Sequence, residues 1–365
     1  MIDRRIKLSA WLKENDIDVA FLTSPNNVFY FSQFLSDPHE RLLGVAIFQE
    51  EEPFLICASM EGNEAKNAGW PHEIIGYSDI DDPWVLVKQT IKSRVHSVHK
   101  MAIEKEHMNI KRYEYLSELF AGTLFVTAED KIRQLRLVKD QYEMIKLREA
   151  CKLADYAVET GINEISERKT ELEILAAIEY EMKKKGVLEM SFSTMVLTGK
   201  NSASPHGTPG KTKIQKGDLV LFDLGVVVDG YCSDITRTVA FHDLSEEQEK
   251  IYETVLASQL TALKKIKSGT IAADVDLAAR NYIHSAGYGQ YFPHRLGHGL
   301  GISVHEYPSI TETNSMILEE GMVFTVEPGI YVPNVGGVRI EDDVVVTATG
   351  VESLTKYPKE LQIIR

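Results

Sequence analysis

Short apolar runs alternate with helical and polar segments over the first third of the chain. Residues 17–22, 43–48 and 53–57 are apolar runs bounded by polar or turn-forming residues, and they predict buried strands. The segments between them carry helical patterns, and no part of this region has the spacing of metal ligands. We therefore expect residues 1–130 to form a small α/β domain that serves as a platform.

A long helical stretch is expected to begin near Ile132 and to open a second domain over residues 131–365. Its apolar positions recur at spacings of three and four, which is typical of an amphipathic helix. The members of this stripe are Met144, Leu147, Cys151, Ala154 and Val158. Core packing accounts for the stripe, and the pattern assigns it no chemistry. The polar segment 127–139 is the expected junction between the two domains.

Two acidic residues flank a predicted β-hairpin in the second domain. The dipeptide at 229–230 is Asp-Gly between two β-rich runs, which strongly favours a two-residue turn. With that turn, Gly225 lies opposite Asp234, and Asp223 becomes a diagonal neighbour of Asp234, about 7–8 Å away at the backbone. Two carboxylates so close repel each other unless a cation lies between them. The alternative to a cation site is that both aspartates are exposed to solvent on the strands.

Histidines and glycines gather in the segment 293–306. His294 and His298 have the spacing of a helical zinc pair, but the surrounding glycines, Gly297, Gly299 and Gly301, argue against a helix. A loop that presents an imidazole to a crowded site is the better interpretation, with His305 close behind. His206 lies in the turn-rich loop 202–210, which on its own is a weak signal.

Two glutamates complete the candidate site. Glu327 ends an apolar strand at a Pro-Gly turn, and Glu341 is expected inside a second strand-like run. A carboxylate in an apolar strand needs a partner, because burying it unpaired is very unfavourable. Taken singly, each acid could instead lie on the solvent face of an edge strand.

Composition and charge narrow the class of protein. The chain has 365 residues, 44% of them hydrophobic, which is enough for two globular domains. Its formal net charge of −14 would repel a phosphate backbone, so a nucleic-acid partner is not expected. No apolar run is long enough for a signal peptide or a membrane span. The cysteines, Cys57, Cys151 and Cys232, form no CxxC pair, so a reducing, cytoplasmic location is expected.

The candidate residues occur in order within recognisable motifs. These are Asp223 in Phe-Asp-Leu-Gly, Asp234 in Ser-Asp-Ile-Thr-Arg-Thr, His298 in Gly-His-Gly-Leu-Gly, Glu327 in Val-Glu-Pro-Gly and Glu341 in Arg-Ile-Glu-Asp-Asp. With them the chain resembles the metal-dependent peptidases of the pita-bread fold, the group of methionine aminopeptidase, aminopeptidase P and prolidase. The resemblance implies an α+β fold, with a pita-bread (creatinase/aminopeptidase-like) catalytic domain preceded by the smaller α/β domain.

The resemblance also implies a centre with two divalent metal ions. In it Asp234 and Glu341 would bridge the ions, Asp223 would chelate one, and His298 with Glu327 would complete the other. An oxygen-rich set of this kind suits Mn²⁺, with Co²⁺, Fe²⁺ or Zn²⁺ able to compete. A metal-bridging hydroxide would attack the peptide carbonyl, and Glu327 would shuttle the proton.

Further residues are implied to line the substrate pocket. By resemblance, His305 would hydrogen-bond the scissile carbonyl or its oxyanion, and His206 and His294 would orient the substrate. Glu327, His305 and His206 are the expected catalytic residues. Arg339 could bind a substrate carboxylate or steady a bridging ligand, and a structural salt bridge is an equal alternative.

Within the family, the resemblance favours an Xaa-Pro dipeptidase of the compact microbial type. Methionine aminopeptidases usually lack the large N-terminal domain and a histidine matching His294. The alternatives are aminopeptidase P, which acts on longer Xaa-Pro peptides, a hydrolase of a small non-peptide metabolite, and a non-catalytic binding module. The substrate would be a small peptide with proline second, and the expected assembly is a homodimer. The loop 36–41 could cap the partner's site through His39 or Arg41, or be a plain surface turn.

Overall fold

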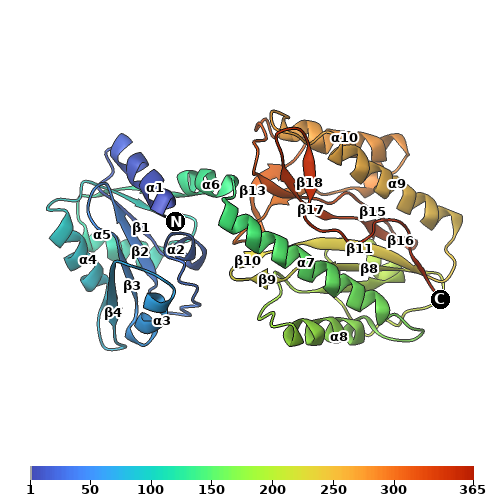
Figure 1. The fold of residues 1–365 in the computed structure, drawn as a ribbon, viewed down its shortest axis with the longest axis horizontal. Coiled ribbons are helices and arrows are strands. Elements are labelled where there is room, and N and C mark those ends of the chain that lie inside the picture. Colours follow the sequence, from blue (N-terminus) through green and yellow to red (C-terminus); the bar gives the residue numbers. More distant parts are fainter. Residues whose placement is uncertain (1) are drawn as a thin grey trace. The chain divides into compact units, whose positions relative to one another are not determined.

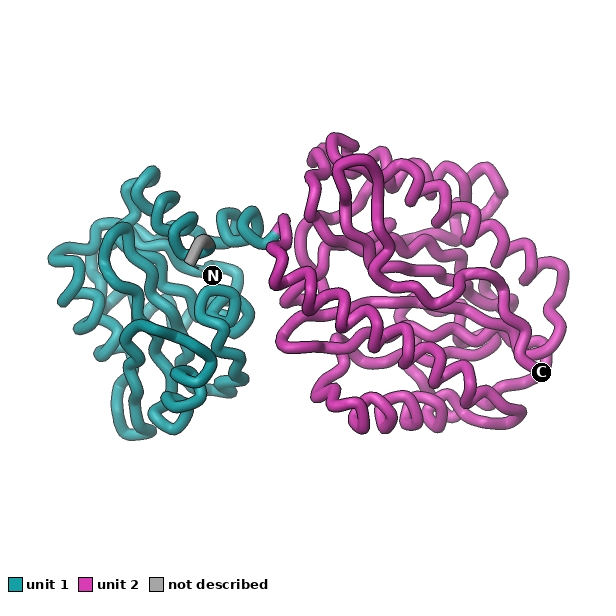
Figure 2. Tube along the Cα trace, viewed as in Figure 1, with its two compact units in different colours: residues 1–136 teal, residues 137–365 magenta. Residues whose placement is uncertain are grey.

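The computed structural model describes residues 2–365 and divides into two compact units. The first unit ends at Arg136, and the second comprises Leu137–Arg365 (Figure 2). The sequence pattern predicts this boundary between residues 130 and 131. The structure puts the division near the end of helix α6 (Glu129–Leu137).

The first unit is built on one mixed sheet of six strands. Their order across the sheet is β4-β3-β2-β1-β5-β6, and Figure 1 labels the first four of these strands. The strands are β1 (Val19–Leu22), β2 (Gly44–Phe48), β3 (Phe54–Ala58), β4 (Glu73–Tyr77), β5 (Lys100–Ile103) and β6 (Leu124–Thr127). Every residue of β1, β2 and β3 is buried, which agrees with their continuous apolar sequence and confirms the three predicted strands.

Helices accompany this sheet, so the first unit is an α/β domain as expected. They are α1 (Ile2–Glu14), α2 (Pro25–Ser32), η1 (Ser59–Glu61), α3 (Gly62–Asn67), α4 (Pro83–Arg94), α5 (Ile110–Leu119) and α6. Side-chain oxygens fix several helix starts. The Ser24 hydroxyl accepts the Asn27 N–H at the start of α2, and the Asp82 carboxylate accepts two N–H groups at the start of α4.

The second unit contains two larger sheets and two strand pairs. The four-stranded sheet has the order β19-β11-β8-β7, and the five-stranded sheet has the order β13-β12-β14-β17-β18. The first comprises β7 (Met195–Thr198), β8 (Asp218–Leu224), β11 (Ile235–Phe241) and β19 (Ile363–Ile364). The second comprises β12 (Gly297–Gly299), β13 (Glu306–Ile310), β14 (Val323–Val326), β17 (Asp342–Val346) and β18 (Val351–Ser353). The pairs are β9 (Val227–Val228) with β10 (Tyr231–Cys232), and β15 (Gly329–Val332) with β16 (Gly336–Arg339).

Each larger sheet has its own helix pair and its own hydrophobic core (Figure 1). Apolar side chains of α7 (Gln141–Asn163) and α8 (Glu171–Lys184) pack with those of β8 and β11. Those of α9 (Glu246–Leu263) and α10 (Ala272–Ser285) pack with β14 and β17. Short turns η2 (Gly199–Ala203) and η3 (Gly289–Tyr291) complete the unit. This two-halved α+β arrangement agrees with the expected pita-bread fold.

The expectation of one continuous helical stretch from Ile132 is wrong. The structure has two helices in this region, α6 and α7. The Asp140 carboxylate accepts the Glu143 N–H, and the Glu143 carboxylate accepts the Asp140 N–H. This reciprocal capping box starts a new helix after three non-helical residues. Within the described residues, no helix combines the length and the apolar character needed to cross a bilayer.

Candidate metal centre

Asp223 and Asp234 lie on one β-hairpin. β8 and β11 pair so that Asp223 lies opposite Thr236, which makes Asp234 its diagonal neighbour. The turn is at Asp229 and Gly230, whose φ angles of 46° and 82° are both positive, as a type I′ turn requires. The predicted hairpin and its register are confirmed, and they place both carboxylates at one end of the sheet.

His298 lies on β12, between two strands that approach closely. A Cβ on Gly297 would lie 1.9 Å from the Thr325 carbonyl oxygen, and one on Gly299 would lie 2.0 Å from that of Tyr307. Glycine is therefore the residue that permits this packing, and the prediction that the segment is not a helix is confirmed. The imidazole is buried, and its Nδ1 lies 3.1 Å from the Gly299 carbonyl oxygen.

Glu327 and Glu341 occupy positions between strands. Glu327 directly follows β14, as the sequence predicts. The expectation that Glu341 lies inside a strand is wrong, because it lies in the break between β16 and β17. There the chain leaves the β15–β16 pair to join β14, and the Glu341 N–H donates to the Thr236 carbonyl on β11 (3.1 Å).

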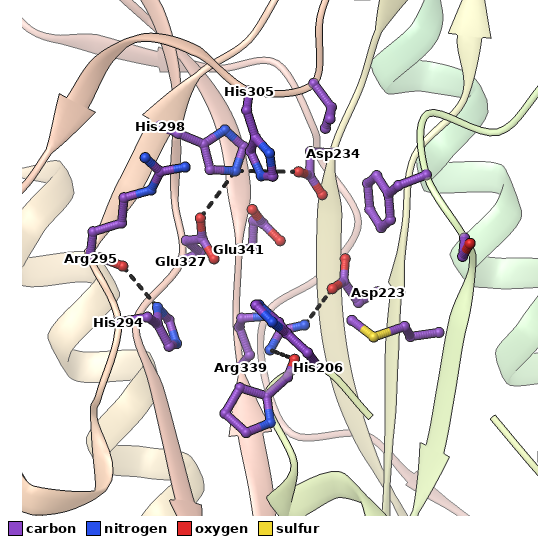
Figure 3. A pocket seen from close by; sticks show the side chains of 15 residues that line it. His206, Asp223, Asp234, His294, Arg295, His298, His305, Glu327, Arg339 and Glu341 are labelled. Carbon is purple, nitrogen blue, oxygen red and sulfur yellow. Dashed lines mark hydrogen bonds and ion pairs between the residues drawn. The ribbon is translucent and has the colours of Figure 1, made fainter. Parts of the chain in front are cut away.

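These side chains converge on one point (Figure 3). Asp234, His298 and Glu341 each offer a ligand atom, and these three atoms lie within 4.8 Å of one another. His298 Nε2 lies 3.3 Å from Glu327 Oε1 and 3.7 Å from Asp234 Oδ2. Asp223 lines the same cavity and is ion-paired with Arg339. The structure therefore brings all five sequence-predicted ligands to one cavity.

Two observations indicate that the four carboxylates and the imidazole can bind a cation. Oδ1 of Asp223 and Oδ1 of Asp234 are buried and have no hydrogen-bond partner. Such orphaned carboxylate oxygens are unfavourable in a protein interior unless a cation or a proton compensates them. Four carboxylates with one imidazole are ligands that divalent first-row metals accept. We conclude that the residues present suit divalent metal ions.

The acid–base properties of the cluster follow from burial. Burial, with the neighbouring Glu341, raises the pKa of Asp234 well above its usual range, and burial with Glu327 does the same to the pKa of Glu341. Burial raises the pKa of Glu327 to about 7, against the opposing effect of Arg339. Burial lowers the pKa of His298 to about 3, so its imidazole is neutral, the form that binds metals.

Arg339 is held on every side by polar partners. Its guanidinium pairs with Asp223, donates to Thr236 Oγ1 (2.9 Å) and donates to the Tyr331 hydroxyl (2.7 Å). Thr236 Oγ1 in turn donates to Glu341 Oε2 (2.6 Å). Arg339 thus contacts one predicted ligand directly and reaches another through Thr236.

The three further histidines of the sequence analysis all line the cavity: His206, His294 and His305. The His305 ring lies edge-on to that of His298, with centroids 4.3 Å apart. Burial lowers the pKa of His305 and lowers that of His294 to about 4. The neutral imidazoles of His294 and His305 each have one donor nitrogen and one acceptor nitrogen.

The cavity has a volume of about 500 Å³ and includes side chains that the sequence reasoning missed. Arg295 adds a second guanidinium, which donates to Ser309 Oγ (3.3 Å). Its position directly after His294 in the motif was the available signal. One wall is formed by Phe192, Ser193 and Met195, which lie in and before β7, where nothing in the sequence pattern indicated a site.

Carboxylates and an imidazole gathered around a cavity are typical of a metal-dependent enzyme, hydrolases among them. Residues 145–348 match the model of metallopeptidase family M24, and residues 4–138 match the creatinase/prolidase N-terminal domain. The chain therefore belongs to metallopeptidase family M24, as the motifs predicted.

Three proteins are similar to this chain over all or nearly all of its length. The Bacillus subtilis (strain 168) protein YkvY, whose name assigns it provisionally to the dipeptidases, is 55% identical over 363 residues, with 100% of both chains covered. The solved Xaa-Pro dipeptidase from Bacillus anthracis is 34% identical, with a TM-score of 0.93, covering 100% of this chain and 99% of the other. The X-Pro aminopeptidase from Thermotoga maritima MSB8 is 33% identical, with a TM-score of 0.87 and coverages of 96% and 98%.

Proposed function

We propose that this metallopeptidase is an Xaa-Pro dipeptidase, which cleaves the bond before proline in dipeptides. The observation that carries the proposal is the intact set of five ligand side chains around a cavity of about 500 Å³, a size suited to a small peptide. The likeness over the full chain to the Bacillus anthracis Xaa-Pro dipeptidase supports the same substrate class.

We propose that Asp223, Asp234, His298, Glu327 and Glu341 hold two divalent metal ions, Mn²⁺ being the first candidate and Co²⁺, Fe²⁺ or Zn²⁺ competing. Such ions, when bound, supply a water of lowered pKa and polarise a carbonyl group. The buried oxygens of Asp223 and Asp234 that lack a partner support this assignment.

We assign proton transfer, binding of the scissile carbonyl and orientation of the peptide to side chains of the protein. Glu327 is the proposed proton shuttle, and in the metal-free protein burial raises the pKa of its carboxyl to about 7. The His305 imidazole would donate a hydrogen bond to the scissile carbonyl oxygen, and its contact with the His298 ring supports this role. His206 and His294 would orient the peptide from the same cavity. Arg339 would hold Asp223, and its reach to Glu341 through Thr236 supports a role in steadying the ligands.

We propose a cytoplasmic homodimer. The cysteines at positions 57, 151 and 232 are buried thiols, which is in keeping with a reducing compartment. The loop 36–41 is the proposed cap of the partner's site. In this loop His39 is exposed, and Arg41 forms ion pairs with Glu40 and Asp79. Cleavage across a dimer would then depend on His39 or Arg41.

Aminopeptidase P is the second candidate, because the Thermotoga maritima X-Pro aminopeptidase resembles the chain nearly as closely. A dipeptidase must accept the free carboxylate of proline, whereas an aminopeptidase P must leave room for further residues. The experiment uses metal-stripped protein reconstituted with Mn²⁺ and compares an Xaa-Pro dipeptide with an Xaa-Pro-Xaa tripeptide.

Preference for the dipeptide supports the proposal, and preference for the tripeptide favours aminopeptidase P. Inactivity on both peptides, with two metals bound, would contradict both and favour a non-peptide substrate. Glu327→Gln should abolish turnover, and Glu320→Gln, which changes an exposed glutamate of the same unit, is the matched control.

A further inference from the structure

Two adjacent buried aspartates behind the metal centre have very different surroundings. Asp342 accepts hydrogen bonds from Arg237 (2.7 Å), Lys359 (2.5 Å) and Gln259 (2.7 Å), so its charge is fully compensated. Asp343 is equally buried, yet among the described residues no cation pairs with it. Its position must therefore be explained by other contacts.

Asp343 connects a helix to a predicted metal ligand. Its Oδ2 accepts the backbone N–H of Asp234 (2.8 Å) and the S–H of Cys151 (3.3 Å). Its Oδ1 has no hydrogen-bond partner. A buried carboxyl group held by one amide and one weak thiol donor is poorly compensated, so charge pairing does not explain its position.

Cys151 belongs to the α7 stripe that the sequence pattern explained by core packing alone. α7 packs against β8, β10 and β11, so the helix brings the thiol to the hairpin that carries Asp234 (Figure 1). The side chain is fully buried. Burial raises the pKa of the Cys151 thiol well above its usual range, so the sulfur keeps its proton and can act as a donor.

We propose that Cys151 and Asp343 are positioning residues for Asp234. The thiol anchors Asp343 Oδ2, and that oxygen holds the Asp234 amide, so that the Asp234 carboxylate is kept in the cavity beside His298. Fixing a ligand through its neighbours in this way raises metal affinity without touching the metal. The inference rests on the metal centre proposed above and not on the peptide specificity.

The test measures metal binding without substrate. Mn²⁺ is titrated calorimetrically into metal-stripped wild type, Cys151→Ala, Cys151→Ser and Val158→Ala. Val158 is a buried residue of the same helix and controls for a simple packing defect. We expect Cys151→Ala to bind Mn²⁺ roughly tenfold more weakly. Cys151→Ser, which keeps a donor, should stay close to wild type, as should Val158→Ala. The visible absorption of bound Co²⁺ should change only for Cys151→Ala.

Wild-type affinity in Cys151→Ala, or equal losses in the serine and Val158 variants, would overturn the proposal. A second pair of variants applies if Cys151→Ala does not fold. Asp343→Asn keeps an oxygen for the Asp234 amide and should bind Mn²⁺ more tightly than Asp343→Ala, and equal binding by the two would contradict the inference. The metal titration contains no peptide, so it does not depend on the proposed peptide specificity. If wild type binds Mn²⁺ in this titration but cleaves no Xaa-Pro bond in the peptide assay, only the proposed specificity is refuted. A wild type that binds no Mn²⁺ refutes the metal centre and this inference together.

Discussion

His294 Nε2 lies 2.9 Å from the hydroxyl oxygen of Tyr331, and the surrounding bonds determine which atom donates. His294 Nδ1 lies 2.8 Å from the Arg295 carbonyl oxygen, which can only accept, so Nδ1 carries the proton. The Tyr331 oxygen already accepts from Arg339 (2.7 Å). Burial keeps the imidazole neutral, so Nε2 has no proton and accepts the hydrogen bond from the tyrosine hydroxyl.

This arrangement predicts a pH-dependent contribution to stability. Burial lowers the pKa of His294 to about 4 in the folded protein, whereas an unfolded histidine titrates near 6.5. Between these values the unfolded chain binds more protons, so stability falls as the pH falls from 6.5 to 4, by up to about 3 kcal/mol from this residue. Urea unfolding of wild type and His294→Gln at pH 7 and pH 4.5 should show a smaller acid-induced loss in the variant. His284→Gln, which changes an exposed histidine, should lose as much as wild type.

Thr325 links two of the predicted ligands, and its hydroxyl should matter more than its shape. Thr325 Oγ1 donates to Glu327 Oε1 (3.0 Å) and accepts the backbone N–H of His298 (3.1 Å). Thr325→Val keeps the volume but leaves a buried amide unpaired, which should lower the unfolding free energy by about 1–3 kcal/mol. It should also weaken Mn²⁺ binding, whereas Thr325→Ser should retain both properties. Denaturation and metal titration measure them, and equal behaviour of the two variants would contradict the role of the hydroxyl.

Removing the Asp234 carboxylate should affect thermal stability differently in the presence and in the absence of metal. Burial and the neighbouring acids make the Asp234 carboxylate unfavourable in the metal-free protein, since its pKa is raised well above the usual range. Asp234→Asn should therefore unfold at the same or a higher temperature than wild type when a chelator is present. With Mn²⁺ at a hundred times the dissociation constant, wild type should gain about 2.7 kcal/mol and the variant should not. Asp243→Asn, at an exposed site, should keep the full metal response.

Gly297 should tolerate no side chain. A Cβ there would lie 1.9 Å from the Thr325 carbonyl oxygen, a backbone atom that cannot move without separating β12 from β14. Gly297→Ala should lower the unfolding free energy by about 3 kcal/mol or more, and it should displace His298. Gly350→Ala, where a Cβ meets nothing within 4 Å, is the control. Thermal unfolding of the two variants tests the argument, which fails if both remain as stable as wild type.

Local rules explain how much of the centre could be predicted from the sequence. The Asp-Gly turn determines the register of its hairpin, so the relation of Asp223 to Asp234 follows from adjacent residues alone. The glycines around His298 exclude a helix on propensity alone. These features depend on residues within about ten positions of one another, where sequence reasoning is strong.

The remaining features depend on contacts between distant segments. The apolar pattern continues across the break that contains Glu341, because Val338, Ile340 and Val344 are all buried. Periodicity therefore gives no sign that the chain changes sheets there. The contact of Cys151 with Asp343 joins residues 192 positions apart, and nothing in a helical stripe distinguishes a donor from a packing residue. The boundary between α6 and α7 is different, because it is a local feature. Asp140 and Glu143 have the spacing of a capping box, so the sequence contains the information needed to predict the start of α7.

The ligands come from both halves of the second unit, with two acids on the β8–β11 hairpin and the others on the five-stranded sheet and its approach. The acids of the two halves approach one another only when the two sheets join, and we expect this to be a late step of folding. Their mutual repulsion then opposes the last step, and a bound cation relieves it. Contacts formed after the transition state act mainly on the unfolding rate. We therefore expect Mn²⁺ to slow unfolding strongly while leaving the refolding rate nearly unchanged.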